Sequence, residues 1–513
     1  MKEKIVLFQG SASAFGKKID LAPLALLAVA SFLHKDGMQV KIIAPSLYND
    51  YMKQAIKDCQ GSICLGITAM TGTQIAEGLE IAKLVKDNYP HLPIVWGGWH
   101  PSILPESTIK DPLVDIVVCG QGERKFYEIV ECLRAGLFND LKNIPGVSYK
   151  SDSGIILNKQ FSIEDMNNFP RVPYDIVDVE KCLNKTEYGN RTIQYISSYG
   201  CPCRCSFCIE PVVNQRRWVS LAAARVVDEW EYLYKKYKID SIAVYDSNFF
   251  VNKKRVMDIC DGLIKKNIKI KWGNANGRIP TLVKYEEDVW QLMKDAGLKM
   301  ILTGSESGEQ KVLDLINKDA SMEDIYKFTA LCDKYDIKVL FSYMSGIPWS
   351  GELKFNAGRV KQEVDSMLTQ TDKLMKISKK NRFMVYAYTP LPGSSMYDMA
   401  KKHGFQEPRT LRGWSELTYS PEDIFKKGAC RQKWISDKQF RLITMLEQYI
   451  FGMMDLDARD WLAQGINNKF FRIIFKMAFN AGYLMARIRL QFKFFALPVD
   501  YWLFVKLRKL IRM

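Results

Sequence analysis

Residues Tyr199–Cys208 read YGCPCRCSFC, and three cysteines of this stretch, Cys201, Cys205 and Cys208, follow the spacing C-x-x-x-C-x-x-C. Iron–sulfur clusters of the four-iron type are normally held by four cysteine thiolates. A loop that supplies three thiolates leaves one iron open to a ligand from outside the protein. An open iron indicates catalysis rather than electron storage, so we expect these cysteines to ligate a catalytic [4Fe–4S] cluster.

A zinc site is the alternative interpretation of this loop, because Cys203 offers a fourth thiolate. Structural zinc sites usually take their ligands as two separated pairs. Four cysteines so close together do not easily close a tetrahedron around one ion. We therefore favour the cluster and interpret Cys203 as a bystander.

The cysteine spacing, the Gly-Cys-Pro opening and Phe207 directly before the last cysteine resemble the radical S-adenosylmethionine (SAM) superfamily. The resemblance implies that the open iron binds the amino and carboxylate groups of SAM. Reduction of the cluster would then cleave SAM to methionine and a 5′-deoxyadenosyl radical. That radical would abstract a hydrogen atom from an unactivated carbon of the substrate.

Length and cysteine content agree with a large enzyme that works in a reducing compartment. A chain of 513 residues exceeds what one hydrophobic core usually organises, so two or three domains are expected. Twelve cysteines are too sparse for a disulfide scaffold, and cluster ligands need reducing conditions. We expect a cytoplasmic protein.

An apolar run, Leu21–Leu33, follows Lys17 and Lys18 and could be mistaken for the core of a signal peptide. Its neighbours argue otherwise, because strand-like stretches precede it at Ile5–Phe8 and follow it at Val40–Ala44. The alternation continues, with further elements expected at 63–67, 74–88, 94–96 and 116–118. This pattern predicts a doubly wound, Rossmann-like α/β domain over residues 1–145, with ligands beyond the carboxyl ends of its strands.

Small residues and glycines follow three of these strands, where they let a large flat ligand approach the backbone. They are Thr68, Ala69, Met70, Thr71 and Gly72, then Gly97, Gly98 and His100, and then Gly120, Gly122 and Glu123. These turns look like the cobalamin-binding domain that many radical SAM enzymes carry in front of the cluster domain. The resemblance implies that these residues contact cobalamin.

One departure from the cobalamin pattern concerns the lower ligand of cobalt. The motif Asp-x-His-x-x-Gly, which supplies that histidine in many cobalamin proteins, does not occur. His100 is the only histidine near the predicted ligand edge. A loop histidine that caps a turn is the more common role for such a residue than a cobalt ligand.

After a linker at 146–190, a second βα series predicts a partial (β/α) barrel over 191–400. Barrel enzymes place their chemistry at the carboxyl ends of the strands. The resemblance to the superfamily implies that four such residues hold the ribose, carboxylate and amino group of SAM: Asp246, Asn276, Arg278 and Glu306. Arg278 could form a forked pair with a carboxylate, although an arginine at a strand end is often only an ion-pair partner.

The last predicted strand reads YAYTP from Tyr386 and resembles the branch that contains the anaerobic magnesium-protoporphyrin monomethyl ester cyclase and several lipid-modifying enzymes. Tyr386 and Tyr388 could line a substrate cavity. Aromatic residues on a strand are nevertheless core packing more often than not.

The region 401–513 is expected to be helical, with a basic, aromatic-rich tail. Residues 466–513 hold ten Lys and Arg and one acid, Asp500, which together account for nine of the sixteen net positive charges. The longest uncharged stretch, Met477–Ala486, is too short to span a bilayer. Such a tail is typical of helices in an anionic membrane surface. The alternatives are a plain helical cap on the barrel and a nucleic-acid arm, and the tail is too apolar for the latter.

Together these patterns predict a cytoplasmic cobalamin-dependent radical SAM enzyme, peripheral on the inner face of the membrane, that methylates an unactivated carbon of a hydrophobic, lipid-like substrate. The resemblance implies that one SAM forms methylcobalamin and a second yields the radical, with electrons from a flavodoxin or ferredoxin. Two alternatives stay open. One is oxidative cyclisation or carbon–carbon bond formation on a tetrapyrrole or lipid, and the other is a non-catalytic cobalamin and iron–sulfur sensor.

Overall fold

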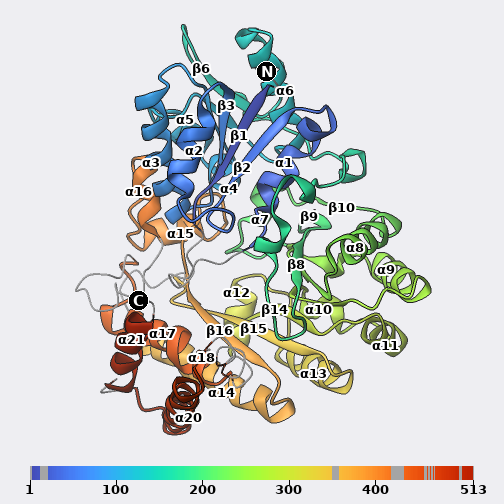
Figure 1. The fold of residues 1–513 in the computed structure, drawn as a ribbon. Coiled ribbons are helices and arrows are strands. Elements are labelled where there is room, and N and C mark those ends of the chain that lie inside the picture. Colours follow the sequence, from blue (N-terminus) through green and yellow to red (C-terminus); the bar gives the residue numbers. More distant parts are fainter. Residues whose placement is uncertain are drawn as a thin grey trace.

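The computed structural model describes residues 3–11, 21–348, 357–417, 432–455, 459, 463, 466, 468–495 and 499–511. The first part of the chain forms a seven-stranded sheet with the order β2-β1-β3-β4-β5-β6-β7, parallel from β1 to β5. Its strands are β1 Lys4–Gln9, β2 Gln39–Ile43, β3 Ser62–Thr68, β4 Ile94–Gly97, β5 Ile116–Val118, β6 Val147–Ser151 and β7 Gly154–Ile156. Helices lie on both sides of this sheet (Figure 1): α1 Leu24–Lys35, α2 Tyr51–Cys59, α3 Thr73–Asn88, α4 Trp99–Ile103, α5 Pro105–Ile109 and α6 Glu123–Arg134.

This domain confirms the predicted doubly wound fold. The central strands are apolar runs buried on both faces, as parallel strands between two helix layers must be. Leu21–Leu33 corresponds to α1, which begins at Leu24 after Pro23 at its N-cap. Lys17 and Lys18 lie outside the described residues.

The structure differs from the expectation at the predicted linker. Strands β6 and β7 form an antiparallel hairpin on the β5 edge, so the first domain extends to Ile156. The start of β6 is buried on both faces, whereas the outer strand β7 is largely exposed, and this exposure fits the polar composition at the sheet edge. Only the remainder of the linker lacks strands, and it contains short 3₁₀ turns at Met166–Asn168, Tyr174–Ile176 and Val179–Cys182.

The second part is the expected open barrel of parallel strands. Two abutting sheets have the orders β12-β11-β8 and β13-β14-β15-β16. The strands are β8 Thr192–Tyr195, β11 Ser241–Val244, β12 Lys271–Gly273, β13 Ala275–Asn276, β14 Met300–Glu306, β15 Lys338–Ser345 and β16 Arg382–Ala387. A small antiparallel pair, β9 Ser198–Gly200 and β10 Trp218–Ser220, brackets the cysteine loop. The helices are α7 Glu210–Val213, α8 Ala223–Tyr237, α9 Lys253–Lys265, α10 Ile279–Leu282, α11 Glu287–Asp295, α12 Gln310–Leu315, α13 Met322–Lys334 and α14 Ala357–Ile377.

The chain then returns to the first domain before it forms a helical cluster. Helices α15 Tyr397–Lys402 and α16 Leu411–Trp414 follow β16, and α16 packs against α3 of the first domain (Figure 1). The cluster beside β16 consists of α17 Asp437–Met445, the π-helical turn η8 Leu446–Ile450, α18 Phe451–Met453, α20 Lys469–Phe492 and α21 Val499–Ile511. The barrel therefore has the first domain at one end and this cluster along its β16 edge.

Candidate active site

A glycine sets the entry to the cysteine loop. Gly200 ends β9 with φ +83° and pairs with Trp218 across the β9–β10 ladder. A Cβ atom at this position would overlap the backbone carbonyl oxygen of Arg217. Only glycine accepts both the left-handed conformation and this close approach. The Gly-Cys-Pro sequence is therefore a structural requirement for projecting Cys201 from the hairpin.

Polar groups approach two of the three predicted cluster ligands. Asn248 Nδ2 donates to Cys201 Sγ at 3.6 Å, and Arg278 Nη2 donates to Cys205 Sγ at 3.8 Å. A hydrogen bond from Cys203 lowers the pKa of Cys201 to about 6, against the opposite effect of burial. Burial raises the pKa of Cys208 to about 12.

These groups fit an iron–sulfur cluster. N–H donors directed at the sulfur atoms are a usual way in which proteins tune such clusters. The structure also leaves Asn248 Oδ1 and Arg278 Nε buried without a hydrogen-bond partner in the described protein, so both side chains have further polar capacity at the loop. In the described part of the chain, no three His, Cys, Asp or Glu side chains converge on a single ion. A cluster does not require such convergence, because its thiolates bind different iron atoms.

Arg278 and Glu306 meet through Lys318, a residue that the sequence did not single out as a site. Lys318 Nζ donates to Glu306 Oε1 at 2.7 Å, and both side chains are less than 10% exposed. Arg278 donates to the Lys318 carbonyl oxygen and pairs with Asp319 at 3.3 Å. Glu306 has φ +58°, a left-handed conformation that costs a glutamate about 1–3 kcal/mol. The buried ion pair holds this strained strand end in place.

Asp246 and Asn276 support the start of the loop from the neighbouring strand ends. The Asp246 carboxylate is fully buried and accepts hydrogen bonds from Ser197 N, Ser197 Oγ and Ser198 Oγ, each at 2.6 Å. Asn276 Nδ2 donates to the backbone carbonyl oxygen of Asp246 at 3.0 Å. Both side chains are used in fixing the turn before β9. The sequence did not identify four polar residues at the cysteine loop as site residues, because a lone Ser, Asn or Lys has no diagnostic spacing. They are Asn248, Lys318, Ser197 and Ser198.

The predicted cobalamin residues gather at the carboxyl edge of the first sheet. Thr68 to Gly72 run from the end of β3 to α3, Gly97 ends β4, and Gly120 and Gly122 precede α6. At Gly98, with φ +97°, a Cβ atom would lie 2.8 Å from Thr68 Oγ1 and 2.9 Å from the Ala69 carbonyl oxygen. Glycine at position 98 is therefore needed for the packing of two strand ends against each other, and its predicted contact with cobalamin stays a prediction. Met70 is the residue of this edge with a large exposed apolar side chain, at 52%.

His100 is buried and enclosed. Its Nδ1 lies 2.9 Å from Thr71 Oγ1, and its ring centroid lies 5.7 Å from that of Trp414 in α16. Burial lowers the pKa of His100 to about 4, so the imidazole is neutral near pH 7. The ring packs between the first domain and the returning C-terminal segment, which agrees with a structural histidine.

A partly buried hydrogen bond connects the predicted cobalamin edge to the cysteine loop. Tyr199 OH donates to Glu123 Oε1 at 2.9 Å, and Tyr199 stands two residues before Cys201. Burial raises the pKa of the Glu123 carboxyl. A second bond, from Ala22 N to Gln194 Oε1 at 2.9 Å, joins the same two domains at the strand that delivers the loop. The two predicted cofactor edges therefore face each other.

Comparisons with known proteins agree with this arrangement. Residues 18–130 match the B12 binding domain, and residues 195–352 match the radical SAM superfamily. The chain is 29% identical to an uncharacterised methyltransferase of Pyrococcus horikoshii over 74% of this chain and 78% of that protein. It is 23% identical to the anaerobic magnesium-protoporphyrin IX monomethyl ester cyclase of Rubrivivax gelatinosus over 73% of this chain and 65% of that protein.

Two solved structures share the fold. The radical SAM methyltransferase TsrM of Kitasatospora setae superposes with a TM-score of 0.62 at 17% identity, over 78% of each chain. The cobalamin-dependent SAM radical enzyme OxsB superposes with a TM-score of 0.70 at 16% identity, over 95% of this chain and 72% of OxsB. The chain therefore has a B12-binding domain followed by a radical SAM domain, the combination that its strand-end turns and cysteine loop predicted.

The role of Gly200 is testable by substitution. We expect Gly200→Ala to destabilise the protein by about 1–3 kcal/mol, because alanine is strained at this φ and meets the Arg217 carbonyl. The amount of iron that this variant binds after anaerobic reconstitution should fall as well. Gly452→Ala is the matched control, since a Cβ at Gly452 meets nothing within 4 Å. Thermal unfolding and iron analysis measure both effects, and full iron binding by Gly200→Ala would contradict the assignment.

Proposed function

We propose that this protein transfers a methyl group to an unactivated carbon of a hydrophobic substrate, in the cytoplasm and at the membrane surface. The observation that carries the proposal is the Glu123–Tyr199 hydrogen bond, which brings the cobalamin edge of one domain to the cluster loop of the other. When bound, the cluster and SAM supply the hydrogen-abstracting radical, and cobalamin supplies the methyl group. The similarity to the P. horikoshii methyltransferase supports this assignment.

The chain's own residues then have distinct roles in this reaction. Asn248 and Arg278 direct N–H groups at the thiolates of Cys201 and Cys205. The Glu306–Lys318 pair fixes the end of β14 next to them. Asp246 holds the turn that leads into β9 and so orients the loop as a unit. We assign positioning roles to these residues, because hydrogen abstraction from carbon needs no general base.

A cyclisation or other oxidative reaction is the second candidate, and the similarity to the cyclase of R. gelatinosus favours it. The two candidates share the cluster, SAM and cobalamin. They differ in the fate of the substrate, because methyl transfer adds one carbon and oxidation does not. Product mass therefore separates them.

The exposed face of α20 supports a hydrophobic substrate and membrane contact. Phe479, Ala486 and Arg489 face the rest of the protein, and Arg489 pairs with Asp500 of α21 at 2.9 Å. On the other side an apolar stripe recurs every three or four residues along a helix of about 36 Å. Its exposed members are Phe470, Ile473, Ile474, Met477, Leu484, Ile488 and Phe492. Val499, Trp502 and Leu503 of α21 are exposed as well.

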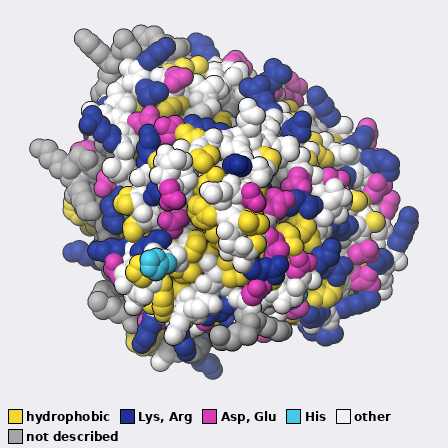
Figure 2. Space-filling model, turned by 90° about the horizontal axis from the view of Figure 1, so that it is seen from above, with side chains coloured by type: hydrophobic (Ala, Val, Ile, Leu, Met, Phe, Trp, Pro, Cys, Tyr) yellow, Lys and Arg dark blue, Asp and Glu magenta, His cyan; other side chains and the backbone are white. Residues whose placement is uncertain are grey.

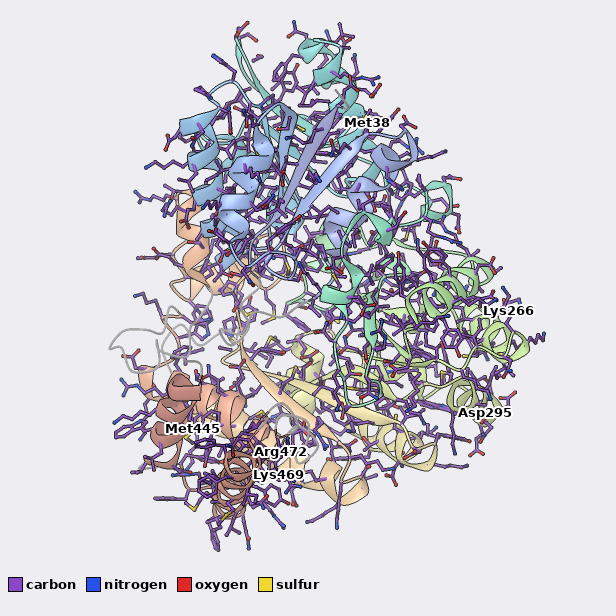
Figure 3. All side chains as sticks on the ribbon, in the orientation of Figure 1. Met38, Lys266, Asp295, Met445, Lys469 and Arg472 are labelled. Atoms are coloured by element: carbon purple, nitrogen blue, oxygen red, sulfur yellow. The ribbon has the colours of Figure 1, made fainter. Side chains whose placement is uncertain are left out.

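Basic residues flank this stripe. Lys469, Arg472, Lys476 and Arg487 fall on one side of it by helical spacing, and Figure 3 labels Lys469 and Arg472 at the start of α20. Over the face above the first domain, in contrast, acidic and basic side chains are interspersed (Figure 2). A solvent-exposed apolar stripe with a basic border matches an anionic lipid surface better than a plain cap. Arg512 and the side chains of Arg508 and Lys509 lie outside the described residues, and no described helix is long and apolar enough to cross a bilayer.

The products of reaction test the proposed chemistry. With iron, sulfide, cobalamin, SAM, a reductant and a lipid extract, we expect 5′-deoxyadenosine, S-adenosylhomocysteine and a lipid heavier by one methylene unit. Cys205→Ser should lose 5′-deoxyadenosine and the heavier lipid, because a cluster ligand is removed, whereas Cys203→Ser should retain all three products. Deoxyadenosine without S-adenosylhomocysteine would favour oxidation or cyclisation. If neither nucleoside forms despite an intact cluster, the result would favour the non-catalytic cobalamin and iron–sulfur sensor.

Vesicle flotation tests the membrane surface. We expect the wild type to float with phosphatidylglycerol vesicles at low salt and less with phosphatidylcholine vesicles, since each basic residue near an anionic surface contributes about 1 kcal/mol. The double variant Ile473→Glu/Met477→Glu should stay in solution. Leu137→Glu, which changes an exposed apolar residue of the first domain, is the control. If the double variant floats like the wild type, α20 does not contact the membrane. If the wild type is a dimer in solution and the double variant is a monomer, the apolar stripe binds a second copy of the chain instead.

A further inference from the structure

The alternation of β15 and β16 identifies the residues that face the barrel interior. Phe341 stacks on Phe383 with centroids 5.8 Å apart, and its ring lies 6.3 Å from Phe328 of the outer helix α13. Phe341 and Phe383 therefore point outward, and their strand neighbours point inward. The inward residues at the carboxyl half of these strands are Ser342, Met344, Met384 and Tyr386.

Tyr386 is accessible at this inner surface although the protein surrounds it. Its side chain is 45% exposed, yet the surrounding protein, together with the carboxylates of Glu447 and Glu306, raises the pKa of its phenol to about 12. A side chain that is both accessible and surrounded lies in a recess. Tyr386 OH also approaches Met384 Sδ at 2.6 Å, so the recess has a thioether wall with a polar phenol in it.

A π-helical turn packs along the β16 edge beside Tyr386. The turn η8 separates α17 from α18 and follows Met445, which Figure 3 labels in the helical cluster. Phe451, the residue after the turn, lies 5.9 Å from Phe383 and fixes this segment to β16. Leu446, Tyr449 and Ile450 are buried, whereas Glu447 stays partly exposed. Such turns re-aim side chains and occur often at functional sites.

The Glu447 carboxyl does not take part in holding the described protein together. No described residue donates a hydrogen bond to it or pairs with it, although burial raises its pKa to about 7. The other carboxylate near Tyr386, that of Glu306, is already paired with Lys318. A recessed carboxyl of this kind is an acceptor that lacks a donor. Its carboxyl lies close enough to Tyr386 to act on that phenol, which itself contacts the Met384 thioether, and this combination suits a ligand with one polar group.

We propose that Glu447 and Tyr386 bind the polar end of the substrate, a hydroxyl or amine that donates a hydrogen bond, while Met344 and Met384 contact its apolar body. This inference rests on the proposed function, because it places the substrate in the barrel interior. It adds a substrate class, namely an amphiphilic alcohol or amine. It also adds Glu447 of the C-terminal cluster as a specificity residue. Glu447 acts on binding and not on SAM cleavage.

Substitution tests the assignment in the reconstituted holoenzyme. We expect Glu447→Ala to reduce turnover of the lipid extract at limiting concentration by about ten- to a hundredfold, because the enclosed donor of the substrate then lacks its acceptor. Glu447→Gln should lose less, because the amide oxygen still accepts. Cluster absorption and substrate-independent 5′-deoxyadenosine formation should not change. Glu416→Gln, at an exposed site, is the control, and turnover by Glu447→Ala equal to that of the control would overturn the proposal.

A chemical readout keeps this test separate from the proposed reaction. Dicyclohexylcarbodiimide modifies protonated carboxyls in apolar surroundings, so peptide mass spectrometry should find it on Glu447 and not on Glu416. Dodecanol and dodecylamine should protect Glu447, and dodecane should not. Protection without any extract turnover would mean that the methyl-transfer proposal fails while the binding site holds. Absence of labelling, or equal protection by dodecane, would overturn the site itself.

Discussion

The architecture depends on one constraint: two cofactor edges, built by two separate sheets, must face each other. The partly buried hydrogen bond from Tyr199 to Glu123 crosses this junction two residues before the first cluster cysteine. A hydrogen bond of this kind contributes about 0.5–3 kcal/mol net, so this pair helps to hold the two domains together. The returning segment adds to the junction, since Trp414 packs on His100 in the first domain. The interface therefore also determines the place of the cysteine loop.

Rigid polar contacts surround that loop. Asp246 holds the entry, Asn248 and Arg278 approach the sulfurs, and the Glu306–Lys318 pair supports the end of β14. Most of these groups are buried and hydrogen-bonded within the protein, although Asn248 Oδ1 and Arg278 Nε have no described partner, whereas the side chains of Tyr386 and Glu447 are partly accessible. The predicted cluster site is therefore enclosed more tightly by the protein than the proposed substrate site.

The sequence predicted the fold and the cluster loop well, because both have periodic or closely spaced signals. Alternating strands and helices gave the doubly wound domain, and the cysteine spacing gave the cluster. Residues 147–156 were misassigned to a linker, since a short polar hairpin on a sheet edge has no distinctive pattern. The packing role of Gly98 was not predicted, because its closeness to Thr68 and Ala69 arises only when two strand ends meet in the fold. Lys318, Trp414 and Glu447 could not be found in advance, since each reaches its partners only through tertiary packing.

The most direct test of the account is the magnetic coupling between cobalt and cluster. The protein would be reconstituted anaerobically with cobalamin, iron and sulfide, reduced so that both centres carry unpaired electrons, and measured by electron paramagnetic resonance. The account predicts that each signal is broadened or split by the other, because the two edges meet at the Tyr199–Glu123 junction. Two independent signals, identical to those of protein loaded with one centre at a time, would contradict it.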